Sequence, residues 1–342
     1  MILKFKENRV RRAYYGGARI DRFVGKPEPK DGRYPEQWLA SSVEAFNPDM
    51  VKEGEGLSFT EAGECFRDLL QKNGRELLGA RCYERDGKEM SLLVKLLDSA
   101  ERLVIQCHPT VEFARERMGS PFGKTECWYI LDAEPSAHVY LGFKEGITRE
   151  RWEALFHAQD VEGMLSCLHK FPVEAGDLWF VAGGVPHAIG GGSFMIELQE
   201  PSDLMVIPER VTPSGVVLAE KKLHGGLGFD GMFDLYAYEG LSERETRERY
   251  FRHPEKMLNT PVPIVDASLT DKFSMTRLQV FPEAKIDLSD SYAVAVVTEG
   301  SGTLWEKDTR LDIKKGDNFF ISANAGELRL EGDAALVLCI SR

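Results

Sequence analysis

Short apolar runs separated by turn-forming residues dominate the chain from about residue 80 onward. They read MSLLVKLLD, ECWYILD, AHVYLGF, GDLWFVA and FMIELQE, with Gly, Pro, Asp or Asn between them. Runs of this length, bounded by turn residues, favour a β-barrel or β-sandwich over a parallel sheet that alternates with helices. The sequence therefore predicts a mainly β protein.

Two segments have helical rather than strand periodicity. Residues 55–80 include SFTEAGECFRDLLQKNGRELLG, in which apolar residues recur near helical spacing and a glycine ends the pattern. Residues 148–171 read TRERWEALFHAQDVEGMLSCLHKF, where Thr148 is a suitable N-cap and acidic residues occupy the early turns. We predict helical insertions at both places.

A short internal repeat relates two distant parts of the chain. Residues 176–180 (GDLWF) match residues 316–320 (GDNFF) at an offset of 140. The match suggests two copies of one β unit. At the same offset, His187 in the first copy corresponds to Glu327 in the second. If the first copy holds a metal, we expect the second to have lost it.

Length and charge restrict the class of protein. A chain of 342 residues exceeds one core of ordinary size, so two domains are expected. The first residues lack a signal-peptide pattern, no apolar stretch is long enough to cross a membrane, and the six cysteines form no C-x-x-C pair. We expect a cytoplasmic protein with reduced thiols. The net charge of -12 opposes binding to nucleic acid or acidic membranes, whereas a small anionic substrate remains possible.

Four polar residues in or near apolar runs have the chemistry of a metal site. Gln106 and His108 are two apart, so in a strand they share a face. Glu126 opens another apolar run, and His187 follows a glycine-rich turn that lets the backbone approach a ligand. Two imidazoles, one carboxylate and one amide oxygen suit Zn²⁺ or a neighbouring ion, with room for water or substrate.

The same residues also have an ordinary structural interpretation. A histidine on an apolar strand is more often a satisfied core or surface residue than a ligand. Lys124 and Arg210 would ordinarily be solvated surface charges. The tryptophans at 38, 128 and 179 are expected in the core rather than as sugar-stacking platforms. Spacing alone leaves both interpretations open.

The motif content resembles the type I mannose-6-phosphate isomerase family of the cupin superfamily. Residues 92–131, LLVKLLDSAERLVIQCHPTVEFARERMGSPFGKTECWYIL, resemble its Lys-x-Leu-Asp, Gln-x-His-Pro and Gly-Lys-x-Glu-x-Trp-Tyr signature. The family's second metal segment is similar to residues 176–192. Its Glu-x-x-x-x-Ser-Asp segment is similar to residues 196–203 (IELQEPSD). YYGGARI and PEQWLASS near the start, and the C-terminal residues from about 297, are weaker matches.

The resemblance implies a fold, a reaction and a set of site residues. The fold would be two cupin-like jelly-roll β-barrels: residues 1–260 catalytic and metal-binding, and residues 261–342 metal-free. The implied reaction interconverts mannose 6-phosphate and fructose 6-phosphate through a cis-enediol, with one Zn²⁺ per chain. Carried over by position, the zinc ligands fall on Gln106, His108, Glu126 and His187, and Lys124 and Glu197 match positions that line the active site.

One departure from the family pattern affects the predicted chemistry. The family usually has an arginine five residues after the Ser of its Ser-Asp pair, but this chain has Ile207 there. The nearest arginine is Arg210, and Pro208 makes a local rerouting of the backbone credible. We hypothesise that Arg210 replaces the family arginine as a catalytic residue.

Other functions and the phosphate ligands stay open at the level of sequence. One alternative, suggested by Ile207, is a metal-holding sugar-binding or regulatory protein without isomerase activity. Another is a cupin that uses Fe or Mn in oxidative chemistry, although the Gln ligand argues against it. Four residues are considered as phosphate ligands: Arg19, Ser41, Lys95 and Arg210. The general base, the oligomeric state and the direction of flux are not indicated.

Overall fold

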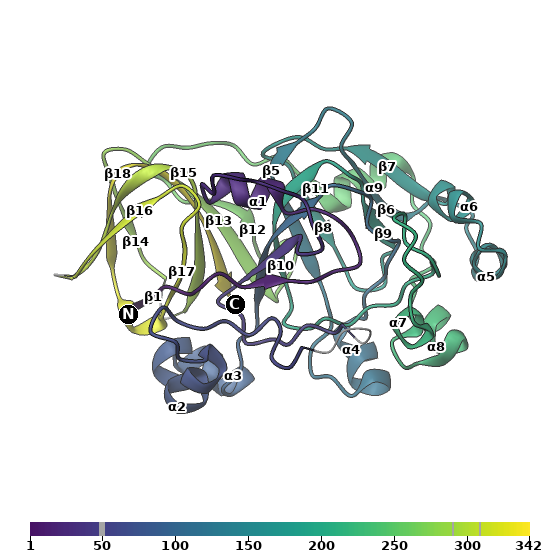
Figure 1. Ribbon diagram of the computed structural model, residues 1–342, viewed down its shortest axis with the longest axis horizontal. Helices are drawn as coiled ribbons and strands as arrows, with labels where there is room; N and C mark the ends of the chain where they lie inside the picture. The colour runs from purple at the N-terminus through teal and green to yellow at the C-terminus, as the bar shows by residue number, and fades with distance from the viewer. Residues whose placement is uncertain (48–51, 289–290, 308) are drawn as a thin grey trace.

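Two β units lie side by side along the long axis of the molecule, and helices surround their edges (Figure 1). This arrangement is taken from a computed structural model that describes residues 1–47, 52–288, 291–307 and 309–342. The mainly β architecture predicted from the apolar runs is confirmed, and each of the five runs quoted above contains a strand.

The first unit consists of a seven-stranded antiparallel sheet and a three-stranded antiparallel sheet. The larger sheet has the order β11 (Phe251–Arg252), β8 (Leu178–Val181), β5 (Glu126–Ala133), β10 (Ser193–Gln199), β4 (Leu93–Ser99), β3 (Glu36–Leu39) and β2 (Arg9–Val10). The smaller has the order β7 (Leu168–Pro172), β6 (His138–Phe143) and β9 (His187–Ile189).

The second unit is an eight-stranded antiparallel sheet. Its main path runs through β1 (Ile2–Leu3), β17 (Asn318–Ile321), β15 (Ala293–Glu306), β18 (Leu328–Ser341), β13 (Phe273–Val280) and β12 (Val262–Val265), while β14 (Glu283–Ile286) pairs with β18 and β16 (Thr309–Lys314) with β15. Thus the first strand of the chain adds to the C-terminal sheet, through Ile2 opposite Ile321. In the described residues the sheets have open edge strands, so the two jelly-roll units implied by the family resemblance are not fully closed barrels.

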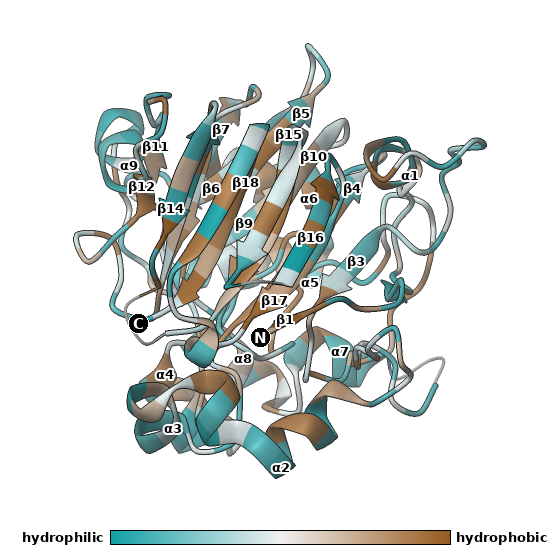
Figure 2. Ribbon diagram, turned by 90° about the vertical axis from the view of Figure 1, so that its left-hand side faces the viewer, coloured by the Kyte–Doolittle hydropathy of each residue, from teal (hydrophilic) through white to brown (hydrophobic). Residues whose placement is uncertain are grey.

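Alternation along the strands builds the hydrophobic cores. On the outer strands of the second unit, polar and apolar bands alternate (Figure 2). The interior of that sheet is an apolar cluster that includes Leu278, Val297, Phe319 and Leu336. A second, larger cluster runs continuously from β5, β8 and β10 of the first unit to β13, β15 and β18 of the second. The predicted boundary at residue 260 therefore falls beside a shared core.

The three predicted core tryptophans are buried, with Trp38 1% exposed and Trp128 and Trp179 0% exposed.

Nine α-helices and two short helical turns occur in the described residues. They are α1 (Ala18–Phe23), α2 (Phe66–Leu78), α3 (Ala80–Asp86), α4 (Val111–Phe113), α5 (Arg149–Ala158), α6 (Val161–Ser166), α7 (Glu220–His224), α8 (Gly228–Asp234) and α9 (Glu243–Tyr250), with a π turn at Ala114–Met118 and a 3-10 turn at Ala323–Ala325.

The helical insertions differ in extent from the prediction. The first begins at Phe66 rather than near residue 55 and continues through α3. The second comprises α5 and α6, and Thr148 caps α5 as expected by accepting a hydrogen bond from Arg151 N. Its end is a strand, because residues 168–172 pair with β6.

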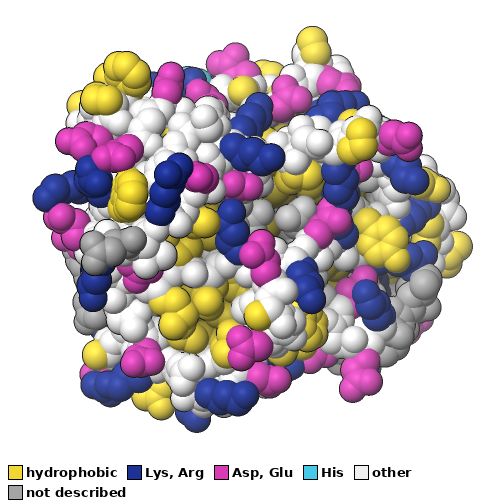
Figure 3. Space-filling view, turned by 60° about the vertical axis from the view of Figure 1, so that its left-hand side comes forward, with side chains coloured by type: hydrophobic (Ala, Val, Ile, Leu, Met, Phe, Trp, Pro, Cys, Tyr) yellow, Lys and Arg dark blue, Asp and Glu magenta, His cyan; other side chains and the backbone are white. Residues whose placement is uncertain are grey.

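No helix in the described parts of the chain is long and apolar enough to cross a membrane. The face in Figure 3 has acidic and basic side chains interspersed.

Candidate metal centre

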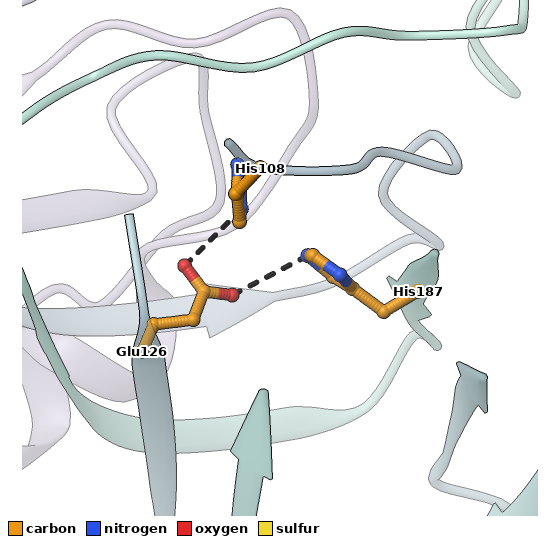
Figure 4. A group of neighbouring side chains, drawn as sticks. All are labelled: His108, Glu126 and His187. Atoms are coloured by element: carbon orange, nitrogen blue, oxygen red, sulfur yellow. Dashed lines mark ion pairs between the residues drawn. The ribbon is translucent and has the colours of Figure 1, made fainter. Parts of the chain in front are cut away.

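His108, Glu126 and His187 converge in the interior of the first unit (Figure 4). The Nε2 atom of His108 lies 3.2 Å from Oε2 of Glu126, and the Nε2 atom of His187 lies 3.3 Å from Oε1 of the same carboxylate. All three side chains are fully buried. One carboxylate therefore faces two imidazoles that come from separate parts of the chain.

Backbone carbonyls orient both imidazoles toward the carboxylate. The Nδ1 atom of His108 lies 3.0 Å from Leu204 O, and the Nδ1 atom of His187 lies 2.9 Å from Val185 O. A carbonyl only accepts hydrogen bonds, so each ring carries its proton on Nδ1 and presents an Nε2 lone pair to Glu126. Protein metal sites use this arrangement to fix the tautomer and direction of a histidine ligand.

The negative charge and the lone pairs of the cluster are only partly matched by positive charge from the protein. Two lone pairs face an ionised carboxylate, and neither Glu126 Oε1 nor His187 Nε2 has a hydrogen-bond partner among the described residues. Lys124 Nζ supplies one positive charge, at 2.7 Å from His108 Nε2 and 2.8 Å from Glu126 Oε2. Buried polar atoms rarely stay unpaired, so the residues fit a small divalent cation.

Gln106 lies beside the cluster through its backbone. It forms an isolated antiparallel bridge with His187, in which both N–H···O distances are 2.9 Å. Residues directly opposite in such a pair project to the same side, so the Gln106 side chain shares the side of His187. The segment is not the regular strand that the sequence suggested, because Cys107 bridges to Val206 instead.

Close backbone packing around two glycines places the His108 loop. A Cβ on Gly123 would lie 2.7 Å from Pro109 O, and one on Gly183 would lie 2.7 Å from Thr110 N. Lys124 N and Gly184 N donate hydrogen bonds to Pro109 O and His108 O. The glycine-rich turn before His187 thus permits the close approach that the sequence suggested.

Charge and burial set the protonation states in the cluster. Burial, followed by the charge of Lys124, lowers the pKa of His108 to about 3, so this imidazole is neutral at physiological pH. Burial alone would raise the pKa of Glu126, but Lys124 and His108 hold it well below its usual value. A neutral imidazole and an ionised carboxylate are the forms that bind a metal.

A pocket of about 660 Å³ lies next to the cluster. Gln106, Lys124 and Glu197 line it together with Lys95 and Ile207. Because Lys124 both contacts the cluster and lines the pocket, the candidate metal centre adjoins a space that a small ligand could enter.

A buried network of ion pairs forms one wall of the pocket. Glu197 and Lys95 are directly opposite on β10 and β4, and Lys95 Nζ lies 2.9 Å from Glu197 Oε2. Arg12 binds Glu36 through Nε at 3.0 Å, and it binds both oxygens of Asp203 at 3.1 and 3.2 Å. With Lys124 and Glu126 included, this wall and the cluster hold three buried cationic side chains and four buried carboxylates, of which that of Asp203 is 4% exposed. A bound cation would offset the excess negative charge.

Burial and buried ion pairs act in opposite directions on the pKa values of this wall. Burial raises the pKa of Glu197. The positive charge of Lys95 opposes this rise, and the negative charge of Glu126 adds to it. Burial would also raise the pKa of Asp203, but Arg12 and Lys95 lower it to about 2. Glu197 is therefore the pocket carboxylate that takes up a proton more readily.

Arg210 does not line the pocket. Its guanidinium lies 5.1 Å from the ring centres of both Phe156 and Phe229, a cation–π arrangement. Ile207 is 2% exposed and lines the pocket at the position where the family pattern has arginine. The structure does not support the hypothesis that Arg210 replaces that arginine.

The four residues considered as phosphate ligands are widely dispersed. Lys95 lines the pocket, but it is bound to Glu197. Arg19 contacts Asp98 and lines a different cleft. Ser41 is buried in a turn, where its Oγ accepts a hydrogen bond from Val43 N. The sequence analysis did not single out Arg102, which lines the pocket and binds Glu209 through two hydrogen bonds of 2.7 and 2.8 Å.

Several residues that shape the site were not assigned a role from the sequence. Glu36 accepts hydrogen bonds from Tyr14 and Trp38, and the Glu200 carboxylate accepts one from Thr125 N, beside Lys124. For two residues of the pocket wall the sequence did contain a motif, because Glu36 lies in PEQWLASS and Asp203 lies in IELQEPSD. Arg12 lies in an ordinary basic stretch, so no local pattern distinguished it.

The second copy of the repeat has a surface ion pair at the position aligned with His187. There Glu327 is exposed and lies 3.0 Å from Lys285. The turn itself is similar in both copies: Asp177 accepts a hydrogen bond from Glu174 N and Asp317 accepts one from Lys314 N, each at 3.0 Å. The repeated Gly-Asp thus closes the same turn in both units.

Comparisons with known proteins agree with the motifs. Residues 4–153 match the model for "Phosphomannose isomerase type I, catalytic domain", and residues 266–341 match "Mannose-6-phosphate isomerase, cupin domain". The chain belongs to the type I phosphomannose isomerase family. The family predicted from the sequence motifs is therefore confirmed, and the protein is placed among the enzymes of that family.

Individual relatives extend the similarity over most of the chain. The mannose-6-phosphate isomerase ManA of Bacillus subtilis is 26% identical over 293 residues, which cover 81% of this chain and 88% of ManA. A crystal structure of the Bacillus subtilis mannose 6-phosphate isomerase has a TM-score of 0.78 at 23% identity, covering 99% of each chain. These likenesses confirm the cupin-like fold.

A solved mannose 6-phosphate isomerase bound with zinc and yttrium is also similar. It has a TM-score of 0.74 at 18% identity and covers 100% of this chain and 99% of its own. Zinc is thus present in a protein of the same fold.

Proposed function

We propose that the protein is a zinc-dependent aldose–ketose isomerase that interconverts mannose 6-phosphate and fructose 6-phosphate through a cis-enediol. The observation that carries the proposal is the buried group of His108, Glu126 and His187 beside a pocket lined by Lys124 and Glu197. Family membership supplies the substrate class, and the donor set supplies the metal chemistry.

Gln106, His108, Glu126 and His187 would hold one Zn²⁺ per chain. When bound, the ion supplies Lewis-acid polarisation of a substrate oxygen. In the structure Lys124 donates to His108 Nε2 and Glu126 Oε2. A metal on the single Nε2 lone pair of His108 would replace the first of these bonds, so Lys124 would then have an N–H free for the pocket. In the proposed reaction that N–H donates to the oxygen on which negative charge develops.

Glu197 is the proposed carrier of the transferred proton. Its carboxylate lines the pocket, and burial raises its pKa toward the range in which a carboxylate can both accept and return a proton. Lys95, directly opposite on β4, fixes its position. Removal of the proton from C2 and its return to C1, together with transfer of the hydroxyl proton from O2 to O1, converts the aldose to the ketose.

The phosphate would occupy the more exposed end of the pocket. Arg102 has 18% of its side chain exposed, whereas Lys95 and Glu197 have 3%. Arg102 and Lys222 supply positive charge at this end, and Thr212 supplies a hydroxyl. The Arg102 guanidinium donates three N–H groups to Leu103 O and Glu209, which leaves two of its five N–H groups for a phosphate. Arg102→Gln should raise KM for mannose 6-phosphate more than it lowers kcat.

A coupled assay on mannose 6-phosphate, together with metal analysis, tests the proposal. Zinc near one equivalent with turnover supports it. Metal without turnover would instead favour a sugar-binding or regulatory protein, for which Ile207 at the family arginine position is the supporting feature. Iron with oxygen uptake would favour oxidative chemistry. Lys124→Met and Glu197→Gln should each lower kcat while zinc content is retained.

A further inference from the structure

A second large cleft lies between the two β units, away from the candidate metal centre. It encloses about 970 Å³ and is lined by residues of α1, β5, β13 and β15. The turns of the internal repeat meet there, because Gly176 from the first copy and Lys315 from the second both line it. In Figure 1, α1 lies between the two units.

Basic side chains outnumber acidic ones in this cleft, although the chain as a whole has a net charge of -12. The basic lining residues are Arg19, Arg22, Lys256, Arg277 and Lys315. The acidic ones are Asp132 and Glu299. A concave site lined by one sign of charge focuses the electrostatic field and concentrates ions of opposite charge.

Most of this positive charge is not neutralised by the protein. Arg19 is held by Asp98, Asp132 and Glu134. In contrast, Arg22, Lys256 and Lys315 have no carboxylate within 4.0 Å among the described residues, although Lys315 lies 5.8 Å from the centre of the Phe23 ring. Like charges that converge without counterions repel one another, so an anion in the cleft would stabilise this arrangement.

Arg277 gives a second, independent indication. Its side chain is 3% exposed and lines the cleft, yet the nearest carboxylate is that of Glu299 at 3.7 Å, beyond hydrogen-bond distance and 55% exposed. Gln279 Oε1 accepts a hydrogen bond from Arg277 at 2.8 Å, and Tyr129 is a second, uncharged hydrogen-bond partner. A buried guanidinium normally has a close, well-aligned anionic partner. Here the carboxylate of Glu299 is too distant to form a hydrogen bond with Arg277.

The local backbone also has a feature common near binding sites. The register of β15 shifts between Val297 and Glu299, and Thr298 at this irregularity lines the cleft. Bulges of this kind re-aim side chains and are frequent beside functional sites. Tyr129 and Phe194 add apolar surface to the wall.

We propose that this cleft is a binding site for a small, multiply charged phosphate ester, separate from the candidate metal centre. Arg277 provides the buried anchor, and Arg22, Lys256 and Lys315 provide charge at the opening. The site is independent of the isomerase function, because the two pockets share no lining residue.

Isothermal titration calorimetry of the zinc-loaded full-length protein tests this site. The probe is 2,3-bisphosphoglycerate, a compact anion with two phosphates and one carboxylate, at constant ionic strength. The test variant is Arg22→Glu with Lys315→Glu, because both side chains are exposed and no ion pair is lost. We expect saturable binding to the native protein, and weakening by at least about tenfold in the variant.

Two controls make the result decisive. Lys72→Glu with Arg81→Glu makes the same change in net charge at exposed positions of α2 and α3 and should alter the affinity by less than about twofold. Arg102→Gln, in the other pocket, should also leave it unchanged. Absence of saturable binding to the native protein, equal weakening in the surface control, or loss only in Arg102→Gln would each overturn the proposal. Turnover of mannose 6-phosphate by the Arg22/Lys315 variant should equal that of the native protein.

Discussion

The two β units share a turn motif but differ in what fills their interiors. The candidate metal centre of the first unit and the pocket wall beside it contain seven buried charged side chains, including Glu126, Lys124 and Asp203. The interior of the second unit contains apolar residues such as Leu304 and Leu336. The apolar interior shows that such a β unit can be packed without charges, so the fold does not require the charged interior of the first unit.

The largest difference between the units is expected for the carboxylates Glu126, in the metal centre, and Glu327, which aligns with His187 in the second unit. Glu126→Gln removes the carboxylate that faces both imidazoles, so zinc content should fall and kcat/KM should drop about 10³-fold, by analogy with the loss of one essential electrostatic group. Metal analysis and the coupled assay measure both. In the second unit, Glu327→Gln should change neither quantity by more than about twofold. Equal losses in both variants would contradict the comparison.

Truncation in the apolar interior should affect stability instead of chemistry. Leu336→Ala removes a fully buried side chain of β18 and should lower the free energy of unfolding by about 2–5 kcal/mol. Chemical denaturation measures the loss. Zinc content and turnover per folded molecule should stay at native values. A loss of zinc in this variant would instead show that packing in the second unit affects the metal centre of the first.

Removal of the metal should loosen the first unit selectively. At zinc concentrations of 100 times the dissociation constant, binding stabilises the native state by about 2.7 kcal/mol, so a chelator should lower stability by that amount. Hydrogen exchange followed by mass spectrometry should show lost protection at residues 104–126 and 183–189. Peptides from β13 and β18 serve as the internal control, and a uniform increase in exchange would argue against a local site.

The buried carboxylates of the first unit should make it sensitive to acid. Ion pairing lowers the pKa of Asp203 from 3.8 to about 2, so the native state binds fewer protons there than the unfolded state between these values. The contribution of this group, about 2 kcal/mol, is complete above pH 4 and is lost as the pH falls toward 2.

The Asp203 effect can be isolated by substitution. In Asp203→Asn, the difference in unfolding free energy from the native protein should shrink across that pH window. Asp312→Asn on the exposed surface of β16 is the matched control and should give a nearly parallel pH profile. A constant difference for Asp203→Asn at every pH would exclude the ion-pair explanation.

The smallest effect is expected for Arg210→Ala. The guanidinium lies beside the neighbouring rings of Phe156 and Phe229, so its loss should cost about 1 kcal/mol of stability through lost cation–π contact. Turnover and zinc content should not change. Arg102→Gln is the comparison inside the pocket, and a larger loss of kcat in Arg210→Ala than in Arg102→Gln would restore the role suggested by the sequence.

Sequence was sufficient for the elements whose determinants are local. The apolar runs predicted β4, β5, β6, β8 and β10, and the Thr148 cap marked the start of α5. Motif spacing also led to the family and to three residues that the fold brings together, His108, Glu126 and His187. Local spacing failed for residues 104–108, where two separate backbone bridges take the place of a regular strand.

Only the tertiary structure decided which charges meet. Whether Arg210 or Arg102 lines the pocket depends on packing between distant segments, and nothing in their immediate sequence distinguishes them. The addition of β1 to the C-terminal sheet, the buried Arg12–Asp203 pair and the basic cleft between the units likewise join residues far apart in the chain. Hydrogen bonds and electrostatic forces act across a few ångströms of space, so the sequence encodes these contacts only through the complete fold.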